Sequence, residues 1–284
     1  MHLTFLGTAA ATALPLPFCH CPVCCQARSL RGKDLRRRSS LLVNGDLLLD
    51  LGPDAPSSAA HFGKDLSSLR YLLQTHAHSD HFDAAHLVTR LAEYASRDVS
   101  PLAIACSRQT AAAMSAALSR EEAGASLLDA SWQRRLGISC QIARPGRVFS
   151  LGPYRILPLP SAHDPAGGSL LYCLWDGEKA LLYATDSLFF DASIWAMLRS
   201  FAHPLSCAVL DHTYGPGIQG EGHMNADQVA ETARLLRAHR LLAPGGIVLA
   251  THISHEGNPP HEALCQWAAQ RGYHIAYDGL SIQL

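Results

Sequence analysis

The most constraining feature of the sequence is a cluster of histidines that directly follows the apolar run at 70–73. His76, His78 and His81 lie with Asp80 within six residues, in the order HAHSDH. Alternate residues of an extended segment share a face, so His76 and His78 can point to one metal ion. The turn that follows can direct Asp80 and His81 to a neighbouring position. Because imidazole and carboxylate ligands suit zinc, iron and manganese alike, the motif predicts a metal site for two ions and leaves the metal open.

Three further candidate ligands follow apolar runs downstream. His163, Asp186 and His252 each stand between such a run and a polar turn. A rigid sheet presents strand-end side chains to a cleft, so we expect these residues to converge on the histidine cluster, although spacing alone does not establish it. A carboxylate has two oxygens and can bridge two cations that would otherwise repel each other at the separation of about 3.5–4 Å in two-metal sites. Asp186 is therefore the expected bridge.

A second cluster of candidate ligands lies at 19–25, where the sequence reads CHCPVCC. Tight turns in this segment can bring Cys19, Cys21 and Cys24 around one ion, and thiolate ligands indicate zinc. A closed tetrahedral site needs a fourth ligand, for which His255 is a candidate. The competitors for that position are His20 and Cys25. The alternative is a loop of reduced surface cysteines, which would be prone to oxidation.

Length and composition limit the class of protein. The 284 residues are expected to form a single domain over 1–284, with the cysteine loop at about 15–30. A hydrophobic fraction of 48% excludes a disordered chain, and a net charge of −1 gives no general attraction to polyanions. The basic run at 36–38 is expected to be a solvated loop. No apolar run is long enough to cross a bilayer and no basic signal start is present, so we expect a cytoplasmic protein.

The hydrophobic pattern predicts a chain of mixed class, α/β or α+β. Short apolar runs bounded by Gly, Pro and Asp predict strands at 3–6, 40–43, 47–50, 70–73, 104–106, 154–157, 170–173 and 181–184. Stretches with helical spacing predict helices at 84–96, 108–118, 192–200, 226–239 and 261–271. The turn Asn44-Gly45-Asp46 predicts a hairpin. We expect sheets packed together with helices outside them.

In content and order, the HAHSDH motif followed by His163, Asp186 and His252 resembles the metallo-β-lactamase superfamily in its dinuclear form. The cysteine cluster, the segment THISH at 251–255 and His223 in the segment GHMN at 222–225 resemble the PhnP-like cyclic phosphodiesterase subgroup. The resemblance spans nearly the whole chain. It implies an αββα sandwich with two divalent cations, manganese or zinc, in the active site and one structural zinc.

The resemblance also implies a role for each candidate residue. It assigns His76, His78 and His163 to one cation. It assigns Asp80, His81 and His252 to the other cation, with Asp186 between the two. It assigns the structural zinc to Cys19, Cys21, Cys24 and His255. Two residues are implied to be catalytic, Asp80 at the metal centre and His223, which would protonate the leaving oxygen.

The implied activity is that of a metal-dependent phosphodiesterase. Its expected substrate is a small cyclic phosphate, either phosphoribosyl cyclic phosphate or a 2',3'-cyclic nucleotide, attacked by a hydroxide that bridges the two cations. One alternative is a lactone or thioester hydrolase on the same dinuclear site. Another is a non-catalytic, PqqB-like metal-binding carrier, against which the presence of all seven candidate ligands argues. We expect a small-molecule substrate and neither a membrane nor a nucleic acid partner, and homodimerisation stays open.

One histidine beside these motifs has no assigned role. His212 adjoins Asp211 in the segment DHTYG at 211–215. It can be a substrate contact, an alternative proton donor or a loop histidine with an ordinary structural role.

Overall fold

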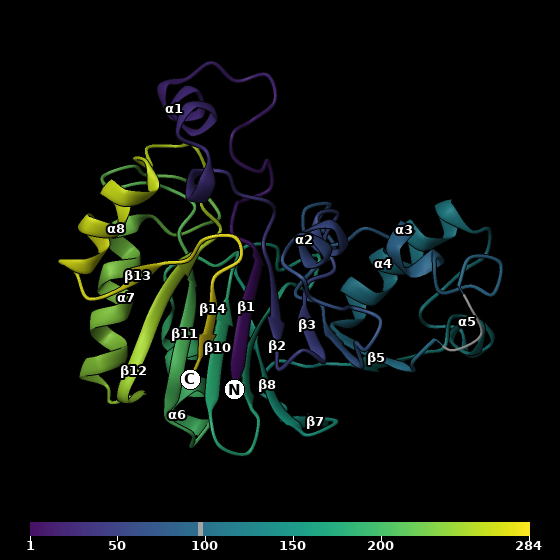
Figure 1. Ribbon diagram of the computed structural model, residues 1–284. Helices are drawn as coiled ribbons and strands as arrows, with labels where there is room; N and C mark the ends of the chain where they lie inside the picture. Colours follow the sequence, from purple (N-terminus) through teal and green to yellow (C-terminus); the bar gives the residue numbers. More distant parts are fainter. Residues whose placement is uncertain (96–98) are drawn as a thin grey trace.

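Two sheets packed face to face form the centre of the protein, seen here in a computed structural model that describes residues 1–95 and 99–284 (Figure 1). In spatial order, the first sheet consists of β14 (Ser281–Gln283), β1 (His2–Gly7), β2 (Ser40–Val43), β3 (Leu47–Leu49), β4 (Tyr71–Leu73), β5 (Leu102–Cys106) and β6 (Ile138–Ile142). The second consists of β13 (His274–Ile275), β12 (Leu242–Thr251), β11 (Leu205–Asp211), β10 (Ala180–Ala184), β9 (Leu170–Trp175), β8 (Tyr154–Pro160) and β7 (Phe149–Leu151).

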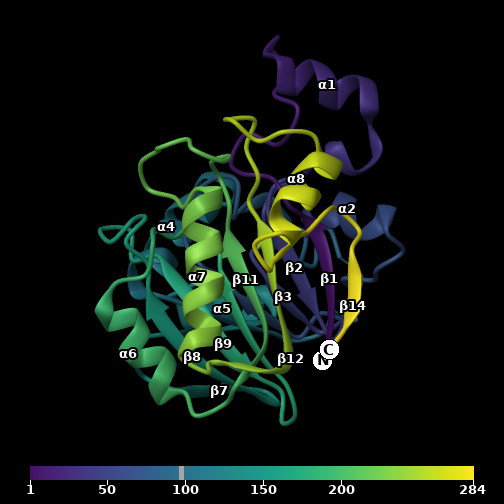
Figure 2. The same ribbon diagram turned by 90° about the vertical axis from the view of Figure 1, so that its left-hand side faces the viewer.

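Helices cover the outer face of each sheet, as Figures 1 and 2 show. The first sheet packs against α2 (Ala55–His61), α3 (Ala85–Val88), α4 (Arg108–Glu121) and α5 (Ala130–Leu136). The second packs against α6 (Ala192–Ser200), α7 (Ala226–Ala238) and α8 (His261–Ala269). A third apolar cluster fills the space between the sheets. This layering confirms the expected αββα sandwich.

Most of the predicted elements are present. The hairpin between β2 and β3 turns through Asn44 and Gly45, both of which have positive φ, as the turn residues indicated. The predicted helix at 84–96 is wrong in extent, because α3 ends at Val88 and the chain continues in turns. Residue 96 of that range lies outside the described residues. Among the residues described, no helix is long and apolar enough to cross a membrane.

The cysteine cluster lies at one end of the sandwich, in the loop that leaves β1. This loop contains α1 (Pro22–Leu30) and the 3₁₀ helix η1 (Gly32–Asp34), which project from the end of the sandwich in Figure 1. Backbone bonds connect the start of the loop to the segment after β12, because Ile253 donates to Thr8 and Ala10 donates to Ile253. The loop is therefore tied to the same segment that carries His252 and His255.

Candidate metal centre

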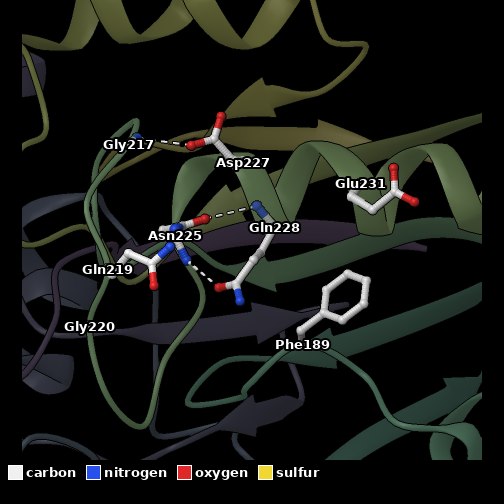
Figure 3. Close-up of a pocket in the computed structure, with 8 residues that line it drawn as sticks. All are labelled: Phe189, Gly217, Gln219, Gly220, Asn225, Asp227, Gln228 and Glu231. Atoms are coloured by element: carbon white, nitrogen blue, oxygen red, sulfur yellow. Dashed lines mark hydrogen bonds between the residues drawn. The ribbon is translucent and has the colours of Figure 1, made fainter.

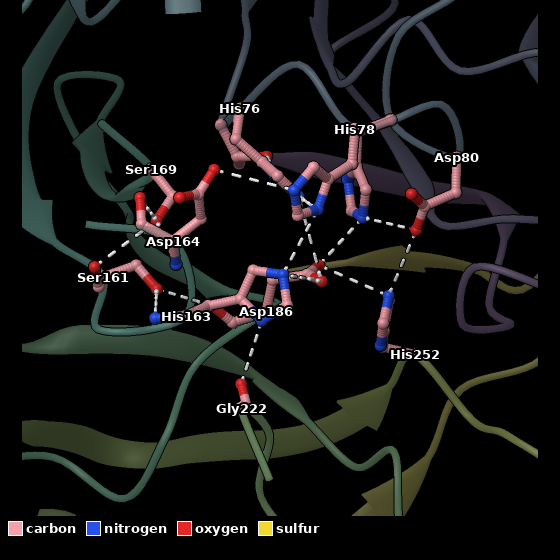
Figure 4. Close-up of polar contacts among 12 residues, drawn as sticks. His76, His78, Asp80, Ser161, His163, Asp164, Ser169, Asp186, Gly222 and His252 are labelled. Carbon is pink, nitrogen blue, oxygen red and sulfur yellow. Dashed lines mark hydrogen bonds and ion pairs between the residues drawn. The ribbon is translucent and has the colours of Figure 1, made fainter. Parts of the chain in front are cut away.

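The candidate ligands gather where strands of both sheets end, and Figure 4 shows most of them together. In the second sheet, β10, β11 and β12 run parallel, so their carboxyl ends lie at one edge. Asp186 follows β10 by two residues and His252 follows β12 directly. His163 follows β8, and the HAHSDH motif follows β4 in the opposite sheet. The site is thus built from both halves of the sandwich.

His76, His78 and His163 form the first ligand group. His78 Nδ1 lies 3.0 Å from His76 Nε2 and 3.3 Å from His163 Nε2. Ligand bonds of about 2.1 Å place neighbouring ligand atoms about 3.0–3.4 Å apart in octahedral or tetrahedral geometry. The three nitrogens therefore have the spacing of atoms that share one cation.

Asp80, His81, Asp186 and His252 form the second group, and all four are buried. His81 Nε2 lies 3.1 Å from Asp80 Oδ2 and 2.8 Å from Asp186 Oδ2. His252 Nε2 lies 3.6 Å from Asp80 Oδ2 and 3.3 Å from Asp186 Oδ2. These distances, from 2.8 to 3.6 Å, lie close to the edges of a coordination polyhedron.

Asp186 faces both groups with different oxygens. Its Oδ1 lies 3.6 Å from His163 Nε2 and 4.0 Å from His76 Nε2. Its Oδ2 faces the nitrogens of His81 and His252. This arrangement is the one required of a carboxylate that bridges two cations.

Three buried atoms in the second group fit a bound cation. His81 Nε2, His252 Nε2 and Asp186 Oδ2 have no hydrogen-bond partner within the described part of the chain. Buried polar atoms without partners are costly, and here all three point to one place.

The backbone conformation is a second indication of a functional site, because Asp50, Asp186 and His252 have positive φ without being glycine. Such conformations gather at functional sites.

One hydrogen-bond relay orients the histidines that come from the first sheet. His81 Nδ1 lies 2.7 Å from Asp50 Oδ2, and His76 Nδ1 lies 2.9 Å from Thr75 Oγ1. Thr75 Oγ1 donates to Asp50, so Asp50 is the acceptor behind both rings. With Nδ1 protonated and engaged, Nε2 of each ring is left as the ligand atom. Asp50 was not among the sequence candidates, although it too follows an apolar strand.

A matching relay orients His252 from the second sheet. Its Nδ1 lies 2.8 Å from Thr213 Oγ1, which donates to Asp211 Oδ1 at 2.9 Å. His163 is oriented differently, because its Nδ1 donates to the backbone oxygen of Gly222 at 3.0 Å. The loop that carries Gly222 therefore helps to position a ligand of the first group.

The electrostatics of the second group favour a cation. Burial lowers the pKa of His81, but the carboxylates of Asp186, Asp80 and Asp50 outweigh it and hold that pKa well above its usual value. Burial raises the pKa of Asp80, but the charge of His81 outweighs it and holds that pKa well below its usual value. Buried carboxylates that stay ionised need a positive partner, and a metal ion can take the place of the proton on His81.

His223 lies beside the ligands and is paired with Asp211. Its Nδ1 lies 2.9 Å from Asp211 Oδ2, which leaves Nε2 for a substrate, and its ring stacks on that of His252. Burial lowers the pKa of His223, but Asp211 outweighs burial and raises it to about 9. Bound cations would lower that pKa again through repulsion of like charges.

A different assignment of His223 is possible on distance alone, since Asp186, Asp211, His223 and His252 also form a group of potential ligands. Two observations favour a proton-transfer role. The Nδ1 of His223 and the Nδ1 of His252 already have partners, Asp211 and Thr213. The Nε2 atom of His252 has no hydrogen-bond partner in the described chain, and it faces Asp80 and Asp186.

Cys19, Cys21, Cys24 and His255 lie together as a third group, with ligand atoms within 4.8 Å of one another. His255 Nδ1 is 3.3 Å from the Cys21 sulfur and 3.6 Å from the Cys19 sulfur. The backbone N–H of Cys24 and the side chain of His255 lower the pKa of Cys21 to about 6, so this thiol is ionised at neutral pH. Burial raises the pKa of Cys24 to about 11, so this thiol ionises only when a metal takes the place of its proton. Three thiols and one imidazole fit a structural zinc.

The two competitors for the zinc lie outside this group. Cys25 is exposed, and its thiol donates to the backbone oxygen of His20. His20 is also exposed. The turn at the start of α1 directs Cys24 inward and Cys25 outward, because consecutive helical residues face different sides.

His212 does not reach the metal centre cavity. It is fully buried, its ring meets Tyr273 edge-on, and both ring nitrogens lack hydrogen-bond partners in the described chain. Burial lowers its pKa to about 3, so the ring is neutral. Of the roles considered for it, a substrate contact and a proton donor are both wrong, because no solvent or substrate has access to the ring.

Two cavities lie around the loops that carry Asp186 and His223. The metal centre opens into one of about 180 Å³, whose wall includes Thr12, Tyr214 and Glu256. A larger cavity of about 380 Å³ lies between Phe189 and the loop at 217–220, shown in Figure 3. Bonds from Gly217 N–H to Asp227 and from Asn225 to the Ile218 oxygen hold that loop to α7, and the cavity contains none of the candidate metal ligands. Volume alone therefore does not locate the active site.

Solved structures with the same fold are similar to this protein over its whole length. A diphosphatase from the PhnP family has 20% identity and a TM-score of 0.71, with 100% of this chain and 97% of that chain covered. Zinc-bound PqqB from Methylobacterium extorquens has 18% identity and a TM-score of 0.72, with 100% of both chains covered. The short form of human tRNase Z has 16% identity and a TM-score of 0.62, covering 100% and 99%.

Sequence comparison identifies the family. No curated protein matches the chain by sequence. The family described as the beta-lactamase superfamily domain matches residues 46–245, which include the HAHSDH motif, His163 and Asp186. This match covers more than half of the chain and agrees with the αββα sandwich and with structural neighbours that include a PhnP family member. The protein belongs to the metallo-β-lactamase superfamily.

Proposed function

We propose that the protein is a dinuclear metal-dependent hydrolase that cleaves a small cyclic phosphodiester. The observation that carries the proposal is the placement of Asp186, which faces one ligand group with Oδ1 and the other with Oδ2. When bound, two divalent cations would supply an activated water and neutralise charge on the phosphoryl oxygens. Family membership supports metal-dependent hydrolysis in general.

The residues of the chain divide the remaining work. The histidines and carboxylates of both groups hold the cations, and the relays through Asp50 and Asp211 keep their rings in place. His223 is held by Asp211 at the wall of the metal centre cavity, with Nε2 available to donate a proton. Its target is the oxygen that leaves phosphorus when the ring opens.

The proton donor supports a substrate whose leaving group is an alkoxide. An alkoxide is a poor leaving group, so a cyclic phosphodiester benefits from an acid beside the metals. Among the similar structures, the diphosphatase from the PhnP family acts on phosphorus, which supports a phosphorus ester over a carboxyl ester as the substrate here. When a lactone opens, its leaving group is also an alkoxide. Hydrolysis of a lactone and hydrolysis of a phosphodiester must therefore be separated by assay.

The test uses the metal-loaded protein and His223→Ala with substrates that differ in their leaving group. For 2',3'-cyclic AMP, we expect His223→Ala to lower kcat by about 10²–10⁴-fold, as is typical of acid catalysis. For bis-p-nitrophenyl phosphate, the loss should be much smaller, because p-nitrophenolate departs without a proton. Metal content should be unchanged. His274→Ala, the same change at an exposed position on β13, is the matched control.

Three results would contradict the proposal. Equal losses with both phosphodiesters would remove His223 from proton donation. Faster hydrolysis of a lactone than of either phosphodiester by the same sample would favour the carboxyl-ester alternative. No turnover of any substrate by a protein with both cations bound would favour a carrier, the alternative that resembles PqqB.

A further inference from the structure

A further open cavity, of about 660 Å³, lies apart from the metal centre. It is lined by residues of η1, the segment at 35–37, the end of α2 and the loop at 277–278, and it shares no lining residue with the cavity of the metal centre. Three of its lining residues are the cations Lys33, Arg36 and Arg37. Asp278 is the carboxylate among them. We call it the basic cavity.

Arg36 supplies a buried positive charge to the basic cavity. The sequence predicted a solvated loop at 36–38, but Arg36 is only 3% exposed, so that prediction is wrong for this residue. The error has a physical cause, since the backbone of Arg36 pairs with Leu14 and directs the side chain inward. Its guanidinium donates to Thr8 Oγ1, to the Ala276 oxygen and to His261 Nδ1.

None of these three acceptors is a carboxylate. The third, His261, stays neutral, because burial and the nearby Arg36 lower its pKa to about 4. A buried cation whose hydrogen bonds all go to uncharged groups is costly, and an anion close by would repay part of that cost. The charges of Asp278 and Asp34 supply part of this compensation, and an anionic ligand in the cavity would add to it.

Lys33 and Arg37 place two further cations at the wall. Lys33 Nζ lies 4.2 Å from the centre of the Tyr277 ring, and Arg37 Cζ lies 5.5 Å from that of Phe62. Both aromatic rings line the cavity, and their contacts with the two cations keep these side chains at its wall. Lys33 is exposed and the side chain of Arg37 is 36% exposed, so a ligand can reach both.

The carboxylate in the cavity does not balance these charges. Asp278 accepts from Thr8 Oγ1 and from the backbone N–H of Arg37, each at 2.7 Å, and it lies 3.9 Å from Arg37 Nη1. Burial raises the pKa of Asp278 to about 6, so this carboxylate is still largely ionised at pH 7. Asp34 also acts on the charge of Arg36. Three cations thus face two carboxylates, which leaves a net positive charge.

We propose that the basic cavity is a binding site for a phosphate group, carried by a small molecule or free in solution. Arg37 and Lys33 contact the phosphate oxygens, the first as a planar fork and the second as a point charge. The buried guanidinium of Arg36 adds electrostatic attraction for the phosphate. Phe62 and Tyr277 offer apolar faces to an organic part of the ligand. The site is independent of the proposed hydrolytic function.

The test follows acetylation of Lys33 by mass spectrometry, with the metal-loaded protein. The chain has three lysines, and Lys64 and Lys179, which do not line the cavity, serve as internal controls. At a probe concentration three times its dissociation constant, labelling of Lys33 should fall about fourfold by mass action. The probes are inorganic phosphate and AMP, with chloride at equal ionic strength for comparison. Tighter protection by AMP would identify an organic phosphate, and equal protection would identify free phosphate.

A pair of matched variants completes the test. Arg37→Met keeps the aliphatic part of the side chain and should abolish protection of Lys33 by either probe. Arg120→Met makes the same change on the exposed surface of α4 and should leave protection intact. The proposal is overturned if neither phosphate nor AMP protects Lys33, if chloride protects equally, if all three lysines are protected alike, or if protection survives in Arg37→Met.

Discussion

Two relays of the same design hold histidines on opposite sides of the metal centre. In the first, His76 reaches Asp50 through Thr75, and in the second, His252 reaches Asp211 through Thr213. Each carboxylate also accepts directly from a further histidine, His81 for Asp50 and His223 for Asp211. One carboxylate thus orients a pair of ligands, and the other orients a ligand together with the proton donor.

Loss of the charge on Asp50 should weaken metal binding. Asp50→Asn keeps the size of the side chain, and asparagine tolerates the positive φ of 65° at this position. We expect affinity for the cations to fall by about 10–100-fold, because the partners of ligating histidines fix their orientation and basicity. Competition with a fluorescent chelator measures this. Asp65→Asn, the same change in an exposed loop, is the control, and equal affinities of both variants would contradict the role of Asp50.

The burial of His212 predicts a pH dependence of stability. Its pKa is about 3 in the folded protein and about 6.5 when unfolded, so below pH 6.5 the unfolded chain binds a proton that the folded chain does not. The stability from the neutral ring is therefore complete above pH 6.5. It is lost as pH falls, by about 1.4 kcal/mol for each pH unit.

Comparison with His212→Phe isolates this effect, because the other titrating groups are shared. Urea unfolding at pH 6.5 and pH 5 measures the free energy of unfolding of both proteins. The wild type should lose about 2 kcal/mol more than the variant over this interval. Equal losses would show that His212 already has access to solvent protons in the folded state.

At the scale of elements, the ends of strands carry the site. Asp186, Asp211 and His252 follow the parallel strands β10, β11 and β12 or end them, and such ends meet at one edge of a sheet. The sequence could predict this for Asp186 and His252, because each follows an apolar run, whereas Asp211 was noted only as the neighbour of His212. It could not predict Asp50 as a shared acceptor, since that role depends on contacts between residues 24 to 31 positions apart.

The same limit explains the errors in individual elements. The pattern at 84–96 has helical spacing, yet α3 ends at Val88, because helical spacing is a weak guide that tertiary context can override. The charge of the run at 36–38 predicted solvent exposure. Its burial at Arg36 follows from pairing with Leu14, which lies on a distant part of the loop. The composition of a segment does not show which distant residues it contacts.

The start of α7 should matter for catalysis as well as for stability. Asn225 and Gln228 form a capping box, and Asn225 Nδ2 also donates to the Ile218 oxygen in the loop that leads to His223. We expect Asn225→Ala to cost about 1 kcal/mol of stability. It should also lower kcat for 2',3'-cyclic AMP, because His223 is then less well positioned.

Asp129→Ala is the matched control for this element. Asp129 caps α5 by accepting from the backbone N–H groups of Ser131 and Trp132, so a similar loss of stability is expected with no change in kcat. Thermal unfolding and turnover are measured for both variants. Equal effects on kcat would mean that the cap of α7 acts through stability alone.

At the scale of the whole molecule, the sandwich brings together two half-sites that neither sheet holds alone. The loop after β4 belongs to the first sheet, and the residues after β8, β10 and β12 belong to the second. The space between the sheets is filled by buried apolar side chains, which fix the two halves relative to each other. The cations would then join both halves at one edge of the sandwich.

The decisive measurement is a crystal structure of the purified protein with anomalous scattering recorded at the manganese and zinc edges. We predict two ions at the histidine-rich edge, one held by His76, His78 and His163 and the other by Asp80, His81 and His252, with Asp186 bound to both. A third ion, zinc, should lie among the cysteines and His255. A single ion at that edge, or an ion held by Asp211 and His223, would contradict the account.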